Sequence, residues 1–516
     1  MDRIRIKNIR SIIDSGDIEL NSINILLGRN SSGKSSFLRL FPMLKESARN
    51  ELRGPILWFD ETYDFGSYAN TFSRHAKSER ETMTLCFTWK PAKTKSNGRL
   101  FYPSRLFSDS TIEDAENVSV ILSIGKAGDE VVLKKMELQI DSMSITIVRL
   151  DNSPNLQVRI NDCIINTFTF VWNYGTSTLL PSLQIVGKVF AYEVLDNALK
   201  KIYVEKGLDI SPLLFFPKTI FNTENEIWNE IESKIVKSTP KKARTIRIEG
   251  NEADRKKVVD AVFIMTIQSL LQDVDDYLTK YFRHTYYITP LRYNFQRYMR
   301  NRDLSVDYID SSGKNVMEYI LSLNKSEKDS YVKYLKKTLK IEVDVEGKEN
   351  KSIFIKTEDG EKDNIVDVGY GFSQVLPIAT TLWDRAYKKI KDEVENTIVI
   401  EQPEVHLHPA MQKRLAVLFV EALNIAKLRG KALKLIVETH SQHLVNHLGK
   451  YVANSYPPRI KELLNYYLTD VDEEVKITPE EISIYLFEKK DGVTSIAKTG
   501  YDKRGQIQRW PIGFLD

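Results

Sequence analysis

A glycine-rich loop near the N-terminus constrains this chain more than any other stretch of it. Residues 28–35 match the pattern G-x-x-x-x-G-K-[ST] at every fixed position. The apolar run 23–27 before the loop predicts a strand, and residues 36–40 after it predict the start of a helix. A phosphate-binding loop occurs in this strand–loop–helix context, so we expect an α/β fold built around residues 28–35, the phosphate loop.

The residue types of the phosphate loop predict a nucleoside triphosphate site. Gly28 and Gly33 let the backbone curl so that its N–H groups point at phosphate oxygens, and the following helix N-terminus adds a favourable dipole. Lys34 is expected to reach the β- and γ-phosphates, and the Ser35 hydroxyl to bind Mg²⁺. The candidate nucleotide-binding residues here are Gly28, Arg29, Asn30, Ser31, Ser32, Gly33, Lys34, Ser35 and Ser36.

A second predicted strand, residues 397–400, ends in two acids. Glu401 follows it directly, and Glu404 comes after Gln402 and Pro403. Buried parallel strands deliver polar side chains in this way to the sheet edge where ligands bind. If the segment stays extended, Glu401 and Pro403 point to one face while Gln402 and Glu404 share the other.

Two more segments have the composition of a nucleotide site. Residues 367–374 form a glycine–serine turn that enters a predicted helix, and residues 434–438 predict a strand that ends in Thr-His-Ser at 439–441. Both belong to the C-terminal half, together with the acidic strand end. The three segments are therefore candidates for the part of the site opposite the phosphate loop.

The remaining regions differ in composition and in the spacing of their apolar residues. Residues 82–89 and 118–124 alternate between apolar and polar side chains and predict an antiparallel meander that continues to residue 164. The next region is richer in aromatic residues and lysine and shows helical periodicity without sustained heptads, which disfavours a coiled-coil arm. The predicted division is an N-terminal lobe 1–165 with the phosphate loop and an antiparallel β subdomain, a helical insertion 166–285, and a C-terminal lobe 286–516.

Composition sets limits on other functions. No run of about 18 apolar residues occurs, so no membrane span is expected. The first residues lack the apolar core of a signal peptide, and two cysteines, Cys86 and Cys163, predict reduced thiols in a cytoplasmic protein. With 74 basic and 70 acidic residues, the charge balance neither demands nor excludes nucleic acid.

Taken in order, these motifs resemble the ABC-type ATPases, and more narrowly their soluble branch with the DNA-repair and SMC-like heads. The pattern Glu-x-Pro-Glu-x-His-x-His-Pro at 401–409 is typical of the overcoming-lysogenization-defect (OLD) group. Residues 64–68 and 510–516 resemble a subgroup that often sits in phage-defence operons, the Septu ATPase subunit being one comparison. The resemblance covers roughly residues 1–150 and 285–516, with a large insertion between the two parts of the head.

The resemblance implies roles for the residues that match. Glu401 takes the Walker B position and would bind Mg²⁺ together with Ser35, and His440 would sense the γ-phosphate. The signature turn, with Gly371, Ser373 and Gln374, would contact the ATP bound by a partner subunit. Two subunits would then enclose two Mg-ATP molecules in a homodimer or higher oligomer.

This chain departs from the ABC pattern in two places. Gln402 stands where most relatives have a catalytic glutamate, and a glutamine cannot accept a proton from water at neutral pH. Glu404 is the nearest alternative base, and otherwise turnover would be slow. No glutamine precedes Gln139, so the usual Q-loop glutamine is also missing. Asp64, Ser67 or His75 could take its place, and the sequence does not choose among them.

Three further features allow two interpretations each. Clustered histidines, His406, His408, His440, His443 and His447, fit either a transition-metal site or polar packing, and the lack of a nearby cysteine favours packing. The segment 286–300 mixes aromatic residues with arginines, which suits either base stacking or a packed connection to the head. The basic run 241–247 suits contact with a phosphate backbone, although acidic residues follow it closely.

The preferred hypothesis is an ATP-hydrolysing switch or scaffold for a separate effector in anti-phage defence. The part of the chain after His440 is too short for the TOPRIM nuclease that OLD proteins carry, so we expect the effector to be a separate nuclease subunit. One alternative is a repair or SMC-like ATPase that acts directly on DNA. Another is a scaffold that binds ATP and hardly hydrolyses it.

Overall fold

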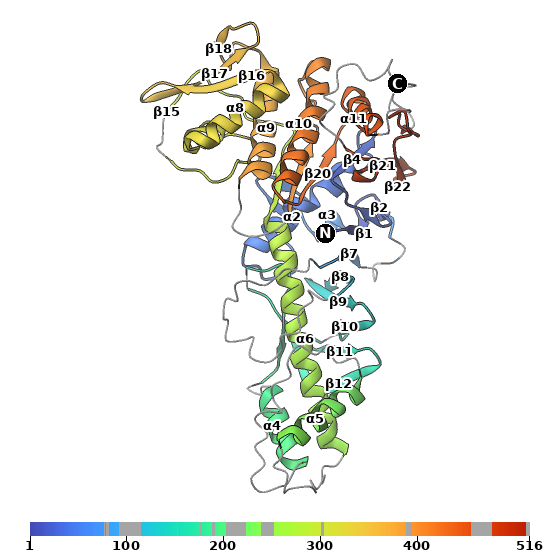
Figure 1. Cartoon of the computed structure of the whole chain (residues 1–516). Coiled ribbons are helices and arrows are strands. Elements are labelled where there is room, and N and C mark those ends of the chain that lie inside the picture. Colours follow the sequence, from blue (N-terminus) through green and yellow to red (C-terminus); the bar gives the residue numbers. More distant parts are fainter. Residues whose placement is uncertain are drawn as a thin grey trace. The chain divides into compact units, whose positions relative to one another are not determined.

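The computed structural model has the mixed α/β architecture that the sequence predicts (Figure 1). Contacts divide the chain into unit 1 (Met1–Asn8, Glu46–Leu57, Ala76–Lys280) and unit 2 (Ile9–Lys45, Trp58–His75, Tyr281–Asp516). Within them the structure describes residues 1–76, 78, 82–91, 115–151, 153–175, 177–187, 191–202, 223–238, 252–300, 304–388, 395–455 and 477–511.

The main sheet of unit 2 positions the predicted site. Its strands run in the order β14 (Thr285–Ile288), β19 (Asn396–Glu401), β20 (Leu433–Glu438), β4 (Ile23–Gly28), β21 (Ile482–Lys490), β22 (Val493–Thr499). All neighbouring pairs are parallel except β21 and β22. Strand β20 therefore lies between the strand that leads into the phosphate loop and the strand that ends in Glu401. Because parallel strands end at a common edge, three predicted segments of the site meet there.

Helices and a smaller antiparallel sheet complete unit 2. Strands β19, β20 and β4 are almost entirely buried, as parallel strands covered on both faces must be. The larger helices are α7 (Val316–Ser322), α8 (Lys325–Leu339), α9 (Tyr370–Tyr387), α10 (Pro409–Leu428) and α11 (Gln442–Asn454). The smaller sheet contains β15 (Met299–Arg300), β16 (Ile341–Glu346), β17 (Asn350–Thr357) and β18 (Lys362–Asn364). Tyr331 and Trp383 pack edge-on inside this core.

The remaining elements are short. Helix α1 begins at Lys34, two residues before the predicted start at residue 36, and α2 follows after one residue. The short elements are α1 (Lys34–Leu38), α2 (Leu40–Arg49), α3 (Tyr68–Thr71), β2 (Ile12–Asp14), β3 (Ile18–Glu19), β5 (Phe59–Asp60), β6 (Tyr63–Asp64) and the 3₁₀ turn Pro479–Glu481.

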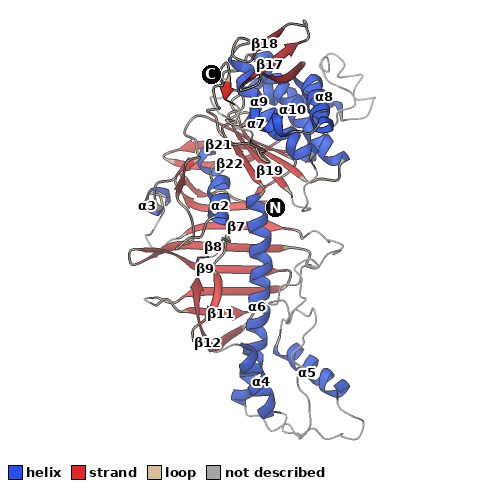
Figure 2. Ribbon diagram, turned by 90° about the vertical axis from the view of Figure 1, so that its left-hand side faces the viewer, coloured by secondary structure: helices blue, strands red, loops and turns tan. Residues whose placement is uncertain are grey.

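Unit 1 is an antiparallel sheet accompanied by a long helix. Its strands are β1 (Arg3–Ile9), β7 (Met83–Trp89), β8 (Val118–Ala127), β9 (Glu130–Ile140), β10 (Met143–Arg149), β11 (Leu156–Ile160), β12 (Cys163–Asn173) and β13 (Ser182–Ile185). Each pairs antiparallel with its neighbour in the order β1, β7, then β8 through β13. Helix α6 (Glu252–Arg283) runs along this sheet (Figure 2), where Tyr277 stacks on Trp89 with ring centroids 4.3 Å apart.

The antiparallel sheet ends later than the sequence indicated. The boundary expected between residues 165 and 166 falls inside β12, because alternation continues through Phe168 and Phe170, whose side chains are buried. Helices α4 (Ala191–Ile202), α5 (Glu224–Ser238) and α6 follow, and α6 contains the buried helix predicted at 261–271. Among the described residues, no helix combines the length and apolarity that crossing a bilayer requires.

Candidate functional site

The phosphate loop is held in a shape that only glycine permits at its two fixed positions. A Cβ on Gly28 would lie 2.3 Å from the carbonyl oxygen of Phe487, on the neighbouring strand β21. Gly33 has φ +100°, and a Cβ there would lie 2.9 Å from Oγ1 of Thr494. The backbone therefore curls tightly between β4 and α1, as phosphate binding through N–H groups requires.

The loop lines a pocket of about 250 Å³. Three basic side chains border it, from Lys34, Arg10 and Lys489, and its lining also includes Ser11, Ser31, Ser32, Gly33, Ser35 and Ser36. Cations, hydroxyls and loop backbone together suit the polyphosphate of a nucleotide. The sequence motif could not reveal Arg10 and Lys489, because only the folded chain brings them to the loop.

Arg10 also contacts Asp64, one of the three residues that could replace the missing Q-loop glutamine. Its Nη2 donates to the carbonyl oxygen of Asp64 at 3.1 Å, and its guanidinium lies 4.6 Å from the ring centroid of Phe65. Burial lowers the pKa of Arg10, and the neighbouring charge of Arg39 adds to this. Ser67 instead caps α3, accepting from the backbone N–H of Asn70.

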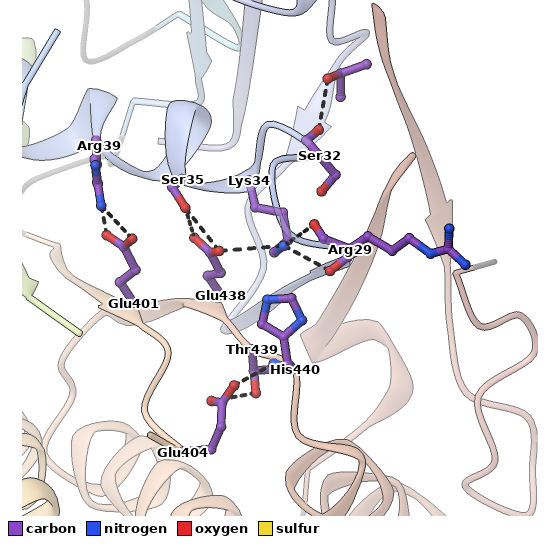
Figure 3. A network of polar contacts seen from close by, with 12 residues as sticks. Arg29, Ser32, Lys34, Ser35, Arg39, Glu401, Glu404, Glu438, Thr439 and His440 are labelled. Carbon is purple, nitrogen blue, oxygen red and sulfur yellow. Dashed lines mark hydrogen bonds and ion pairs between the residues drawn. The ribbon is translucent and has the colours of Figure 1, made fainter. Parts of the chain in front are cut away.

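The polar contacts beside the loop include an acid that sequence reasoning missed (Figure 3). Lys34 Nζ donates to the carbonyl oxygens of Gly28 and Arg29, each at 2.9 Å, and lies 3.6 Å from Oε1 of Glu438. Ser35 Oγ donates to both oxygens of Glu438, at 3.1 and 2.9 Å. The side chains of Lys34 and Glu438 are each only 2% exposed. Burial raises the pKa of Glu438 to about 7, against the opposing effect of Lys34.

Glu401, the predicted Walker B acid, is bound by a different set of partners. Arg39 donates from Nε and Nη2 to its two oxygens, at 3.2 and 2.9 Å, and the Tyr287 hydroxyl donates to Oε2. Burial raises the pKa of Tyr287, and Glu401 adds to this. The metal pair predicted from the sequence was Ser35 with Glu401. In the structure, Ser35 is hydrogen-bonded to Glu438 instead.

The segment after Glu401 turns instead of staying extended. Gln402 has φ +44°, a left-handed conformation, and its N–H donates to the carbonyl oxygen of Glu438 at 2.9 Å. Nη2 of the buried Arg292 donates to the carbonyl oxygens of Glu401 and Gln402, at 3.2 and 3.1 Å. The two-face arrangement expected for an extended segment is therefore wrong, because buried hydrogen bonds stabilise a turn here.

Glu404 and His440 are joined at the end of β20. The Glu404 carboxylate accepts from Thr439 Oγ1 at 2.8 Å and from the His440 N–H at 2.6 Å. Burial raises the pKa of Glu404. The His440 ring lies on the side of the phosphate loop (Figure 3), where burial and the charge of Lys34 lower its pKa to about 4. His440 is therefore neutral at pH 7.

The other clustered histidines have separate surroundings. His408 Nδ1 accepts from the N–H of Ala410 at the start of α10, at 3.4 Å. The ring of His406 lies 6.0 Å from that of Tyr370, and His447 is buried against Tyr451. Within the described ranges, no group of three or more His, Cys, Asp or Glu side chains is placed to hold a metal ion.

The expected signature turn lies at the start of α9. Gly369, with φ +88°, precedes the helix, and Tyr370 is 56% exposed. Ser373 and Gln374 are buried in the first turn of the helix, whereas Gly371 is half-buried. The surface that this turn offers to another molecule is formed by Gly369 and Tyr370 rather than by the Ser373 side chain.

The aromatic and basic segment 286–300 is largely engaged within unit 2. The Tyr286 ring lies 4.3 Å from the Arg385 guanidinium and 5.0 Å from Lys45 Nζ. Arg292 is buried, and Arg297 forms a two-point ion pair with Asp367. The basic run 241–247 lies outside the described residues.

Comparison with solved structures finds SMC heads at low identity. The SMC head domain from Thermotoga maritima is 9% identical, with 96% of this chain and 97% of that chain covered and a TM-score of 0.35. The Smc head domain of Pyrococcus furiosus, bound to the C-terminal domain of ScpA, is 10% identical, with 97% of this chain and 96% of that chain covered and a TM-score of 0.36. The Smc head domain of Pyrococcus yayanosii is also 10% identical, with 98% of this chain and 97% of that chain covered and a TM-score of 0.34. No curated protein matches this chain.

Two family models match the sequence. A family described as a protein of unknown function (DUF3696) matches residues 477–516, which include β21 and β22. The model of the AAA ATPase domain matches residues 1–445, a range that contains the phosphate loop, Glu401, Glu438 and His440. Because that model spans most of the 516 residues, the chain belongs to the AAA ATPase domain family.

Proposed function

We propose that this protein is an ABC-type ATPase that hydrolyses ATP to ADP and phosphate and works as a nucleotide-driven switch. One observation carries the proposal: Lys34, Ser35, Glu401, Glu438 and His440 converge on one edge of the main sheet of unit 2. Bound Mg²⁺ and ATP would supply the charge and the transferable phosphoryl group, and the protein supplies position and electrostatic stabilisation.

Each residue of the phosphate loop has a defined task in this proposal. The N–H groups of residues 28–36 cradle phosphate oxygens, and Lys34 leaves its two backbone acceptors to contact the β- and γ-phosphates. Ser35 holds Mg²⁺ through its hydroxyl. Arg10 and Lys489 border the same pocket and add positive charge. Neutral His440 can donate one hydrogen bond to the γ-phosphate without adding charge.

Hydrolysis is expected to be slow. Gln402 can orient a water molecule but cannot take its proton. Glu404, proposed as the alternative base, has hydrogen bonds to Thr439 and the His440 N–H, which tie it to the switch segment. If Glu404 assists catalysis, Glu404→Gln will lower the phosphate-release rate, and an unchanged rate removes this assignment.

The switch is proposed to act through head-to-head association. Exposed Gly369 and Tyr370, at the start of α9, would contact the nucleotide of a second copy of the chain. The OLD-like pattern at 401–409 and the resemblance of residues 64–68 and 510–516 to phage-defence ATPases support a separate effector as the controlled partner, with a nuclease the preferred candidate. Of these residues, 512–516 lie outside the described part of the chain.

A phosphate-release assay on purified protein tests the enzymatic proposal. Wild type is expected to release phosphate from Mg-ATP, and Lys34→Ala to lose both nucleotide binding and release. Lys333→Ala, an exposed lysine on α8, is the matched control and should behave as wild type. Equal activity in Lys34→Ala and Lys333→Ala would show that the phosphate loop is not the site.

The alternative, an SMC-like ATPase acting directly on DNA, is tested by salt-dependent DNA binding. Protein that contacts several phosphates loses affinity steeply as salt rises. In segment 286–300, the contacts of Tyr286, Arg292 and Arg297 within unit 2 give this alternative less support than the sequence suggested. Tight binding of duplex DNA at low salt, lost at higher salt, would favour it over a separate effector.

A further inference from the structure

The edge of the main sheet carries three acids, of which Glu401 and Glu438 are buried and Glu404 is half-buried, and they differ in what they contact. Both oxygens of Glu401 are bound by Arg39, with Tyr287 on one of them. Glu404 is hydrogen-bonded to the end of β20, through Thr439 and the His440 N–H. Of the three acids, Glu438 alone accepts hydrogen bonds from a phosphate-loop side chain, the hydroxyl of Ser35.

We infer that Glu438, on the strand that leads to His440, is the carboxylate linked to the nucleotide's divalent cation, in place of the Walker B residue Glu401. This rests on the proposed function of the phosphate loop. It moves the metal-linked acid by one strand, from β19 to β20, next to the loop strand β4. Glu438 then becomes the residue that makes nucleotide binding depend on the metal.

The contacts of Lys34 give the physical reason. Lys34 Nζ lies 3.6 Å from Glu438, so the buried carboxylate, when ionised, has a cation beside it. When Lys34 turns towards phosphate oxygens, Glu438 keeps only the Ser35 hydroxyl among its phosphate-loop partners. A buried charge that loses its counter-ion is strongly unfavourable. A divalent cation on the same hydroxyl restores the balance, because Glu438 lies within hydrogen-bond distance of the atom expected to bind it.

Glu401 does not lose its counter-ion when Lys34 turns towards the phosphates. Its cation, Arg39, belongs to α1's C-terminal cap rather than to the phosphate loop, so it stays in place when Lys34 moves. The charge of Glu401 is therefore balanced by Arg39 both before and after Lys34 moves. Nucleotide without metal should therefore be repelled mainly by Glu438, whose removal should weaken the preference for the metal complex.

Fluorescence titration with mant-ATP, in excess Mg²⁺ and in EDTA, tests the inference. The readout is the ratio of the two affinities, which is separate from hydrolysis. Wild type is expected to bind more tightly with Mg²⁺, and Glu438→Gln to lower the ratio about 10- to 100-fold, partly by tighter binding in EDTA. The comparison variant Glu401→Gln removes a charge from the same edge and should change the ratio much less.

The other outcomes are equally decisive. A wild-type ratio in Glu438→Gln, or a loss of the ratio confined to Glu401→Gln, overturns the inference while leaving the proposed ATPase intact. No mant-ATP binding by wild type in Mg²⁺ overturns both. If Glu438→Gln does not fold, Glu438→Asp keeps the charge but withdraws it from Ser35. It should also lower the ratio, and a wild-type ratio in Glu438→Asp contradicts the inference.

Discussion

Glu401 and Glu438 are cross-strand partners at the ends of β19 and β20, yet each carboxylate is bound by a different cation. Arg39 binds Glu401 at 2.9 Å, and Lys34 of the phosphate loop lies 3.6 Å from Glu438. Separate counter-ions let two adjacent buried carboxylates coexist, since two unpaired ones would repel each other. In the proposed mechanism, the carboxylate of Glu401 stays paired with Arg39, whereas that of Glu438 responds to nucleotide.

Replacing Gln402 tests whether slow chemistry is built into the site. Gln402→Glu supplies a carboxylate that can accept a proton from water, so the single-turnover rate of phosphate release should rise, by up to about 100-fold. Gln402→Asn is the control, because asparagine tolerates the left-handed backbone and remains an amide. The same rate in all three proteins would argue that residue 402 does not contact the attacking water.

Arg292 should act on the rate rather than on nucleotide affinity. Its Nη2 holds the carbonyl oxygens of Glu401 and Gln402 in the turn, and burial lowers its pKa to about 10. Arg292→Ala should lower the free energy of unfolding by about 2 kcal/mol through lost charged hydrogen bonds. It should slow phosphate release while leaving the KM for Mg-ATP within a few-fold. Arg292→Lys should restore part of both losses. A change confined to KM would contradict a positioning role.

The Arg39–Glu401 pair should show strong coupling in denaturation. Arg39→Ala leaves Glu401 buried without its cation. Because Arg39 is partly exposed, we expect the free energy of unfolding to fall by about 2 to 3 kcal/mol, less than for a fully buried pair. In a Glu401→Gln background the same change should cost much less, since no charge remains to be balanced. Urea denaturation of the four proteins of this cycle measures the coupling. Equal costs in both backgrounds would show that the pair does not stabilise unit 2.

The C-terminal segment should depend on a close approach between two glycines. A Cβ on Gly449 of α11 would lie 1.9 Å from the carbonyl oxygen of Gly505. Gly449→Ala should therefore lower the midpoint of thermal unfolding, with a loss of about 3 kcal/mol or more because neither backbone can yield cheaply. Gly500→Ala, where a Cβ meets nothing within 4 Å, should change stability by less than about 0.5 kcal/mol. Matching midpoints in the two variants would contradict this packing.

Local patterns predicted the framework of the fold well. The strands at 23–27, 397–400 and 434–438 and a helix after the phosphate loop are all present, because each has a clear apolar pattern and flanking turn residues. The end of the antiparallel sheet was misplaced because aromatic residues in β12 fit both a strand and a packed helix. The three-part division of the chain stays a prediction.

The partners of each charge could not be predicted from local patterns. In the sequence, Glu438 looks like the end of an ordinary strand. It comes within hydrogen-bond distance of Ser35 only because β20 lies between β19 and β4. Tyr287 and Arg39 are distant in sequence from Glu401, and nothing in their local sequence indicates the contact. The left-handed φ of Gln402 depends on hydrogen bonds from Arg292, more than one hundred residues away in the chain.

The molar mass of the protein in solution tests the switch most directly. Light scattering on the wild type should give the mass of a dimer with Mg-ATP and of a monomer with Mg-ADP or without nucleotide. Lys34→Ala should stay monomeric throughout. A wild-type mass that does not change among these three conditions would contradict a switch that works by nucleotide-driven association of two heads.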